Sequence, residues 1–191
     1  MPPTKNSRTP ATEVRANLIA AGRRLLERDG AAALTVRAVA TEAGVAPMGV
    51  YNHFDGKDGL LDAVVTDGFG EFGSRIAATE ADPAARLLAS GRRYREFALA
   101  NPRLYELMFS TECHPDDDVA AEAFEVLADI IRYGQAAAII MAGDPYVLAG
   151  QVWACVHGAV SLELAASHPP FLDPSANYAQ LLDLIARGIR A

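Results

Sequence analysis

The stretch TVRAVATEAGVAPMGVYNHF, residues 35–54, contains two short helical patterns that meet at a glycine. In the first, Thr35 can cap a helix N-terminus, and apolar residues follow at helical spacing. Gly44 can adopt the left-handed conformation that ends a helix, and Pro47 suits the first position of the next one. The pattern predicts one helix from Thr35 to Ala43 and a second from Pro47 to Phe54.

Two helices joined by a short turn with glycine form the helix-turn-helix pattern, whose second helix lies in the major groove of DNA. The second helix here offers Tyr51, Asn52 and His53 outside its apolar face, and Lys57 follows just past its end. These side chains can reach phosphates and base edges. Spacing alone leaves an alternative open, which is an ordinary helical hairpin in a bundle.

Residues 34–65 resemble the helix-turn-helix of the tetracycline-repressor (TetR) family, and the close match extends over about residues 12–65. The resemblance implies that the chain binds DNA through the second helix. The residues that carry it are Thr35, the AxxAGV run from Ala40 to Val45, the aromatic pair Tyr51 and Phe54 around Asn52 and His53, and Lys57 before Leu60 and Leu61.

From this resemblance we expect two groups of DNA contacts. The residues expected at phosphates are Thr35, Tyr51, His53 and Lys57. The residues expected nearest the bases are Pro47, Met48 and Asn52, with Met48 suited to thymine methyl groups and Asn52 to adenine. Two further residues of the surface depart from the family pattern and leave the base preference open. Ala46 stands where Ser or Thr often caps the helix, and Gly49 weakens it.

Charge is divided unevenly along the chain. The formal net charge is −7, which by itself argues against a nucleic-acid partner. Residues 1–60, however, hold eight Lys and Arg against six Asp and Glu, whereas residues 61–191 hold nine against eighteen. A mildly basic head on an acidic body fits a regulator that makes a few phosphate contacts.

Composition points to the cytoplasm. Half of the residues are hydrophobic, enough for a sizeable core, yet no run of 18 apolar residues predicts a membrane span. The N-terminus lacks the apolar region of a signal peptide. Cys113 and Cys155 are far apart, as expected for free thiols in a reduced compartment.

The pattern divides the chain into three parts. Residues 1–11 are polar and read as a disordered arm, in which Lys5 and Arg8 either reach along DNA or belong to a solvated tail. Residues 12–56 form the DNA-binding domain, which begins with an amphipathic helix over 12–29 capped by Thr12. Residues 57–191 form a ligand-binding and dimerisation domain.

The larger domain is predicted to be helical throughout. It starts with a long helix over 57–79. Four Asp-Pro or Asn-Pro pairs then predict helix starts near residues 83, 102, 145 and 174, and the acidic residues 116–118 predict a fifth start. No stretch alternates like a strand. We therefore expect an all-α fold of about nine helices, with a three-helix head and a helical bundle.

The last two helices are predicted to pair the chain with a second copy. The helix after Asp144 is nearly apolar, and its small residues allow another helix to approach closely. These are Gly150, Ala154, Gly158 and Ser161. The last helix carries an apolar stripe of Tyr178, Leu182, Ile185 and Ile189. A homodimer would place two recognition helices about 34 Å apart, as a palindromic operator requires. The alternative is that both helices pack within one chain.

A weaker resemblance concerns the body. Residues 101–109 and 152–158 resemble a C-terminal domain of one TetR subgroup, named for Trp, His and Gly, here Trp153, His157 and Gly158. It implies a body that dimerises and binds a small molecule. Candidate apolar walls are Tyr94, Phe97, Tyr105, Met108, Phe109, Phe124, Leu127, Ile131 and Trp153, with His157 and Glu163 as polar contacts. Taken singly, each of these residues fits an ordinary core better than a ligand contact.

The sequence gives little support for a metal site or a catalytic site. Cys113, His114 and the aspartates 116–118 crowd one turn without a second cluster at ligand spacing, and helix capping explains the aspartates more simply. No catalytic set of residues can be assembled, and we expect neither metal nor cofactor. The sequence predicts a dimeric repressor that a small molecule releases from its operator. The alternative is a helical carrier or enzyme that retains a helix-turn-helix as scaffold.

Overall fold

The computed structural model describes residues 10–191, so the expectations for Lys5, Arg8 and the rest of the N-terminal arm lie outside the described residues. Nine α-helices make up most of this part, and its sole β-feature is an isolated bridge between Ile140 and Arg190. The all-α prediction is confirmed. The helices are α1 (Ala11–Asp29), α2 (Val36–Ala43), α3 (Pro47–Tyr51), α4 (Gly56–Ile76), α5 (Pro83–Ala100), α6 (Pro102–Met108), α7 (Asp117–Ala136), α8 (Pro145–Leu164) and α9 (Pro174–Gly188), with a 3₁₀ turn at Ala31–Ala33.

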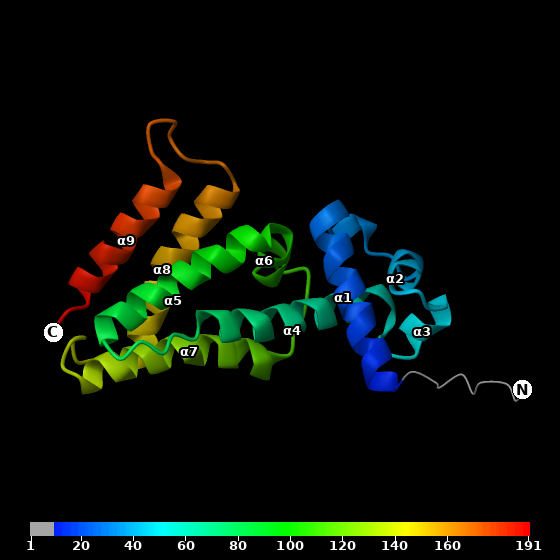
Figure 1. Cartoon of the computed structure of the whole chain (residues 1–191), viewed down its shortest axis with the longest axis horizontal. Helices are drawn as coiled ribbons and strands as arrows, with labels where there is room; N and C mark the ends of the chain where they lie inside the picture. The colour runs from blue at the N-terminus through cyan, green and yellow to red at the C-terminus, as the bar shows by residue number, and fades with distance from the viewer. Residues whose placement is uncertain (1–9) are drawn as a thin grey trace, which may run out of the picture.

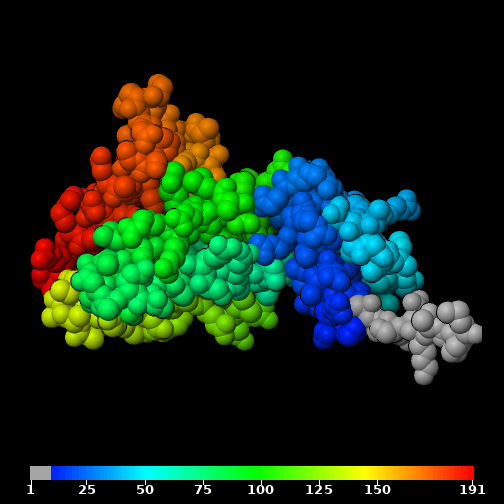
Figure 2. All heavy atoms as spheres, in the orientation of Figure 1, coloured from blue at the N-terminus to red at the C-terminus, as the bar shows by residue number. Residues whose placement is uncertain are grey.

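The molecule is elongated, with a small head at one end and a larger body at the other (Figure 1). Helices α1, α2 and α3 form the head, and α4 runs from the head into the body, where it packs against α5, α6 and α7. Helices α8 and α9 complete the body by packing on α5, and α8 also contacts α7. Apolar side chains from α1 to α4, all fully buried, make the core of the head. They are Leu18, Leu34, Val39, Val50 and Leu60. The space-filling view shows the head projecting beyond the body (Figure 2).

Helix starts follow the predicted capping residues. Five predicted starts are confirmed, at α5, α6, α7, α8 and α9. Four of these helices have an aspartate whose side chain accepts backbone N–H groups of the first turn: Asp82, Asp116, Asp144 and Asp173. Asn101 before α6 makes no cap hydrogen bond, since its Oδ1 accepts from the Arg23 guanidinium and its amide nitrogen donates to the Phe97 carbonyl. In the head, Thr35 caps α2 by accepting from the Ala38 N–H.

Three predicted boundaries are wrong. Helix α1 starts at Ala11 behind Pro10, so Thr12 lies inside the helix and does not cap it. Helix α3 ends at Tyr51 rather than at Phe54, and the turn that follows contains buried Phe54 and Gly56 with a positive φ of 69°. Helix α4 ends at Ile76 rather than at residue 79.

Two glycines of α4 allow its neighbours to come close. A Cβ at Gly68 would lie 3.1 Å from the Leu104 side chain of α6, and one at Gly73 would lie 3.2 Å from the Ala123 backbone of α7. Such contacts leave no room for a larger residue. Helix α4 is therefore packed tightly against α6 and α7 along its length.

The apolar stripe of α9 is covered by the chain itself. Its four residues, Tyr178, Leu182, Ile185 and Ile189, are 9% exposed or less. The Tyr178 hydroxyl donates to the Gly91 carbonyl of α5 at 2.7 Å, and Leu182 packs directly on Gly91. Packing within one chain, which the sequence left open, is thus the arrangement for this stripe.

Helix α8 keeps an uncovered face. By length and composition alone, it is long and apolar enough to cross a membrane. The search for an uninterrupted run of 18 apolar residues did not indicate this helix. Only 28% of that window is buried inside the chain. A Cβ at Gly150 or Gly158 would meet nothing within 4 Å, so the chain's own packing does not require glycine there. The exposed apolar residues Val147 and Leu162 belong to this helix.

Candidate DNA-binding surface and internal cavity

The residues expected at DNA lie together at the outer end of the head. They come from the start of α2, from α3 and the turn after it, and from the first turn of α4. All of them are exposed or partly exposed: Thr35, Ala46, Pro47, Met48, Gly49, Tyr51, Asn52, His53 and Lys57. Met48 and Tyr51 are 66% and 58% exposed although large, while Val50 between them is fully buried. Helix α3 thus rests on Val50 and presents the expected reading residues outward.

Charges of both signs lie at this surface, since exposed Asp55 and Asp58 flank exposed Lys57. Glu42 is held by Arg24 at 3.0 Å and Arg28 at 3.4 Å, and the hydrogen bond from Arg24 lowers the pKa of this carboxyl. Arg37, which sequence reasoning missed, is exposed in the first turn of α2 and forms no salt bridge within residues 10–191. Its position two residues after Thr35 could have indicated Arg37 as a further candidate for a phosphate contact. Arg37 adds a second free cation to that of Lys57.

The head is tied to the body through α1. The guanidinium of Arg23 contacts Asp67 at 2.9 Å and Glu71 at 2.6 Å, both on α4. The Glu27 carboxylate accepts the Leu104 N–H at 2.8 Å, and the Arg103 guanidinium donates to the Glu27 carbonyl at 3.1 Å. These contacts join α1 to both α4 and α6.

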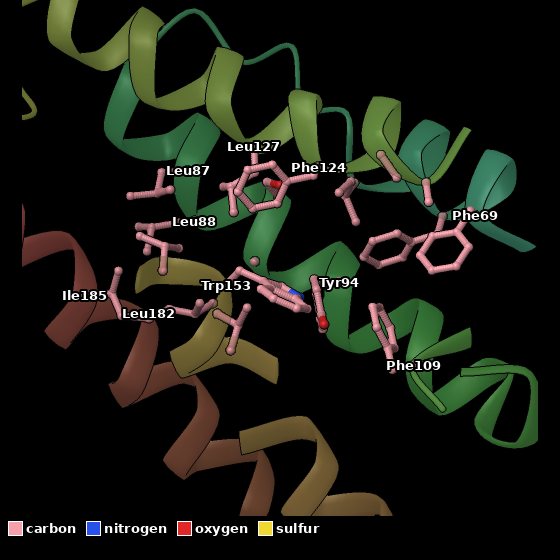
Figure 3. A pocket seen from close by; sticks show the side chains of 18 residues that line it. Phe69, Leu87, Leu88, Tyr94, Phe109, Phe124, Leu127, Trp153, Leu182 and Ile185 are labelled. Atoms are coloured by element: carbon pink, nitrogen blue, oxygen red, sulfur yellow. The ribbon is translucent and has the colours of Figure 1, made fainter. Parts of the chain in front are cut away.

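The body contains a partly open apolar cavity of about 280 Å³ among α4, α5, α7, α8 and α9, with the end of α6 as a further wall. Side chains from these separate helices surround a common space in Figure 3. Five of the predicted wall residues line it: Tyr94, Phe109, Phe124, Leu127 and Trp153. This volume is close to the lower end of the range for ligand sites, about 300–1,000 Å³.

The other predicted ligand residues lie outside this cavity. Phe97 packs against Phe72, a cavity residue, with ring centroids 5.2 Å apart, and Met108 and Ile131 are buried elsewhere in the core. Glu163 is held by Arg95 at 2.7 Å. Tyr105 and His157 line a neighbouring cavity of about 340 Å³, which shares Phe109 with the first.

A triangle of hydrogen bonds closes the apolar cavity near Phe109. The Tyr94 and Tyr105 hydroxyls are 2.9 Å apart, and they lie 3.0 and 2.8 Å from Nδ1 of His157. Burial raises the pKa of Tyr105 to about 12 and that of Tyr94 further, and burial lowers the pKa of His157. All three side chains are therefore neutral near pH 7.

Sequence reasoning missed several cavity residues. They include Phe69, Phe72, Leu87, Ser90, Gly91, Leu182 and Ile185. A signal was present on α5, where Leu87, Gly91 and Tyr94 recur at i, i+4 and i+7 and so share one helix face. No comparable signal indicates which face of α9 meets α5.

The aspartates near Cys113 act locally. Asp116 caps α7, and Cys113 is buried, with a pKa raised to about 11 by burial. Within residues 10–191, no group of three or more His, Cys, Asp and Glu side chains is arranged to hold a metal ion.

Comparison with known proteins identifies two family models along the chain. Residues 18–64 match the one described as bacterial regulatory proteins, tetR family, and residues 87–185 match the tetracyclin repressor-like C-terminal domain. Neither description names the Trp-His-Gly subgroup, which stays a prediction.

Three individual proteins are similar to this chain over nearly its whole length. The chain is 27% identical to the uncharacterized HTH-type transcriptional regulator Rv0681 of Mycobacterium tuberculosis, over 97% of this chain and 85% of that protein. A solved protein of unknown function from Rhodococcus sp. RHA1 is 26% identical, with a TM-score of 0.83 over 99% of this chain and 100% of that one. A TetR-family regulator from Pectobacterium atrosepticum, 23% identical, shares the fold with a TM-score of 0.77 over 97% and 98% of the two chains.

Proposed function

The chain belongs to the TetR family and is a DNA-binding transcriptional regulator, and from this premise we propose that it is a repressor released from its operator by a small molecule. The observation that carries the proposal is the apolar cavity, whose wall includes Phe109 directly after α6, while Leu104 of α6 is bonded to Glu27 of α1. The cavity and the head are thus joined by one short helix. In this proposal the protein acts in the cytoplasm and has no enzymatic activity.

The proposed DNA contacts follow from exposure and charge at the head. Tyr51, His53, Lys57 and the newly found Arg37 would hold phosphates, and Met48 with Asn52 would lie nearest the bases. One α3 helix is only five residues long, so a single head reads few bases. A homodimer with two heads would read a palindrome.

Helix α8 supports the proposed homodimer. Its uncovered face combines exposed Val147 and Leu162 with Gly150 and Gly158, where another helix can approach. Leu184 of α9, 58% exposed, extends the apolar surface. Burial of these side chains between two copies would remove from water apolar area that a monomer leaves exposed.

Release would depend on differential binding. A ligand in the cavity changes the DNA affinity only if it binds one arrangement of the heads better than another. Contacts of Phe109 with the ligand would move α6, and Glu27 and Arg23 would pass the movement to α1. The two heads of a dimer would then change their spacing.

Salt dependence of DNA binding tests this proposal. Fluorescence anisotropy would measure the affinity of the full chain for the DNA upstream of its own gene and for a scrambled duplex, at several salt concentrations. A specific complex that weakens steeply with salt is expected. Binding to neither duplex, even at low salt, would favour the helical carrier or enzyme with a helix-turn-helix scaffold, and a monomer at working concentration would contradict the dimer.

A further inference from the structure

The wall of the apolar cavity holds no formal charge. None of its lining residues is Asp, Glu, Lys, Arg or His, and Tyr94 is kept neutral by burial. An ionised group in such a place loses its hydration without gaining a partner, which is strongly unfavourable. The part of a ligand that lies against this wall is therefore expected to be uncharged.

One polar group of the wall, the Ser90 hydroxyl, is a candidate for a hydrogen bond to a ligand. Ser90 is 4% exposed and lines the cavity, and within residues 10–191 it is the one buried serine. The buried hydroxyl of Tyr94 is already bonded to Tyr105 and His157. A ligand oxygen within reach of the Ser90 hydroxyl would form a hydrogen bond in an otherwise apolar surrounding.

The rest of the wall suits a hydrocarbon. Apart from Ser90, Tyr94 and the indole of Trp153, its side chains are aliphatic or phenyl groups or a glycine. Six of the lining residues are aromatic, and they come from α4 to α8. The cavity volume of about 280 Å³ favours a compact molecule.

We propose that the effector is a compact, uncharged, mainly hydrocarbon molecule with a hydroxyl or carbonyl oxygen that hydrogen-bonds to Ser90. The role of this molecule as an effector rests on the proposed function, in which a ligand in the cavity controls DNA binding. Tyr94 is one helical turn from Ser90, so the polar end of the ligand would lie along α5 and its apolar body against Phe124 and Trp153.

Matched pairs of probes test the charge. Isothermal calorimetry on the full chain would compare decan-1-ol with decanoate, and 1-naphthalenemethanol with 1-naphthoate. Trp153, the single tryptophan of the chain, lines the cavity, so its fluorescence shows whether decan-1-ol enters there. At least one alcohol is expected to bind about tenfold or more tightly than its carboxylate. Carboxylates that bind as well as the alcohols, or no binding of any probe, would overturn the proposal.

A serine pair tests the hydrogen bond. Ser90→Ala is expected to weaken the alcohol that binds by about two- to tenfold, the range for one hydrogen bond. Ser74→Ala is the matched control, because Ser74 is exposed on α4 and bonds only to the Gly70 carbonyl. If the two variants bind the alcohol alike, Ser90 is not the contact and the proposal fails.

DNA binding of the same preparations separates the two proposals. A protein that binds its upstream DNA but prefers carboxylates retains its proposed role as a repressor and loses only this ligand class. A protein that binds alcohols at Ser90 but no DNA retains the ligand class as a binding property and loses the regulatory role. Release of DNA by the alcohol that binds, weakened in Ser90→Ala, would support both.

Discussion

The candidate functional residues are distributed differently along the sequence in the head and in the body. In the head, the candidate contacts lie within residues 35–57, and they are exposed or partly exposed residues on a small buried core. In the body, the cavity draws on residues from Phe69 to Ile185, which are apolar and enclosed. A surface of neighbouring residues can be recognised along the sequence, whereas a cavity exists only after distant helices pack. The link between the two regions is short, and it runs through α4 and α6 to α1.

The largest expected effect comes from breaking the head alone. Val50 is fully buried under α3, so Val50→Asp places an unpaired carboxylate in the core of the head, at a cost of about 3–5 kcal/mol. We expect DNA affinity to fall more than about a hundredfold, since that cost is enough to displace α3. Anisotropy measures the loss. Oligomeric state and Trp153 fluorescence should stay close to those of the wild type. Loss of these as well would show that head and body do not behave as separate regions.

Cutting the link should have the next largest effect. Glu27→Ala removes the carboxylate that accepts the Leu104 N–H, so movement of α6 no longer reaches α1 by this route. We expect the ligand-induced loss of DNA affinity to shrink by about fivefold or more, within the usual range of coupling between sites. Titrations of DNA with and without the alcohol that binds would measure it. Glu13→Ala, an exposed change in the first turn of the same helix, is the control. Equal coupling in both variants would assign the link to α4 and Arg23.

The sequence predicted those parts of the molecule that depend on near neighbours. Asp82, Asp144 and Asp173 act on backbone groups two or three residues away, so the helix starts could be recognised without the fold. The C-terminal end of α3 was harder to predict, because it depends on the burial of Phe54 in the hydrophobic core.

The cavity shows where such prediction stops. Phe97 and Tyr94 are both aromatic, one turn apart on α5, yet only Tyr94 lines the cavity while Phe97 packs behind Phe72. Which of them faces the space depends on how α5 crosses α4 and α8, which neither residue encodes alone. Ser90 was missed for the same reason, since its hydroxyl matters only once it is enclosed.

A smaller effect is expected from single phosphate contacts. Lys57→Ala should weaken binding to every duplex alike, by a few-fold, and should lower the salt slope by about 0.9, the value for one phosphate contact. Arg37→Ala should do the same if this newly found cation is a contact. Anisotropy at several salt concentrations measures both. Arg75→Ala, at the far end of α4 and paired with Glu71 at 3.2 Å, is the control and should leave the slope unchanged. An unchanged slope in the Lys57 variant would remove Lys57 from the contacts.

The smallest expected effect concerns pH and belongs to the body alone. Burial lowers the pKa of His157 below the usual value of about 6.5, so below that pH the unfolded chain binds a proton that the folded chain resists. His157 therefore favours unfolding as pH falls from about 6.5, whereas above it the side chain is neutral in both states. His157→Gln keeps an acceptor for the tyrosine hydroxyls but does not titrate, so its melting temperature should fall less between pH 7 and pH 5, by about one or two degrees.

Thermal melting by circular dichroism measures this difference, with His114→Gln as the control, because His114 is exposed and its side chain stands outside the triangle. The control should follow the wild-type curve. The head should not contribute, since Tyr94, Tyr105 and His157 all lie in the body. DNA affinity at pH 7 would therefore stay unchanged in the His157 variant, if the triangle serves only to close the cavity. A His157→Gln curve parallel to the wild type would show that this histidine accepts its proton freely and that the triangle opens to water.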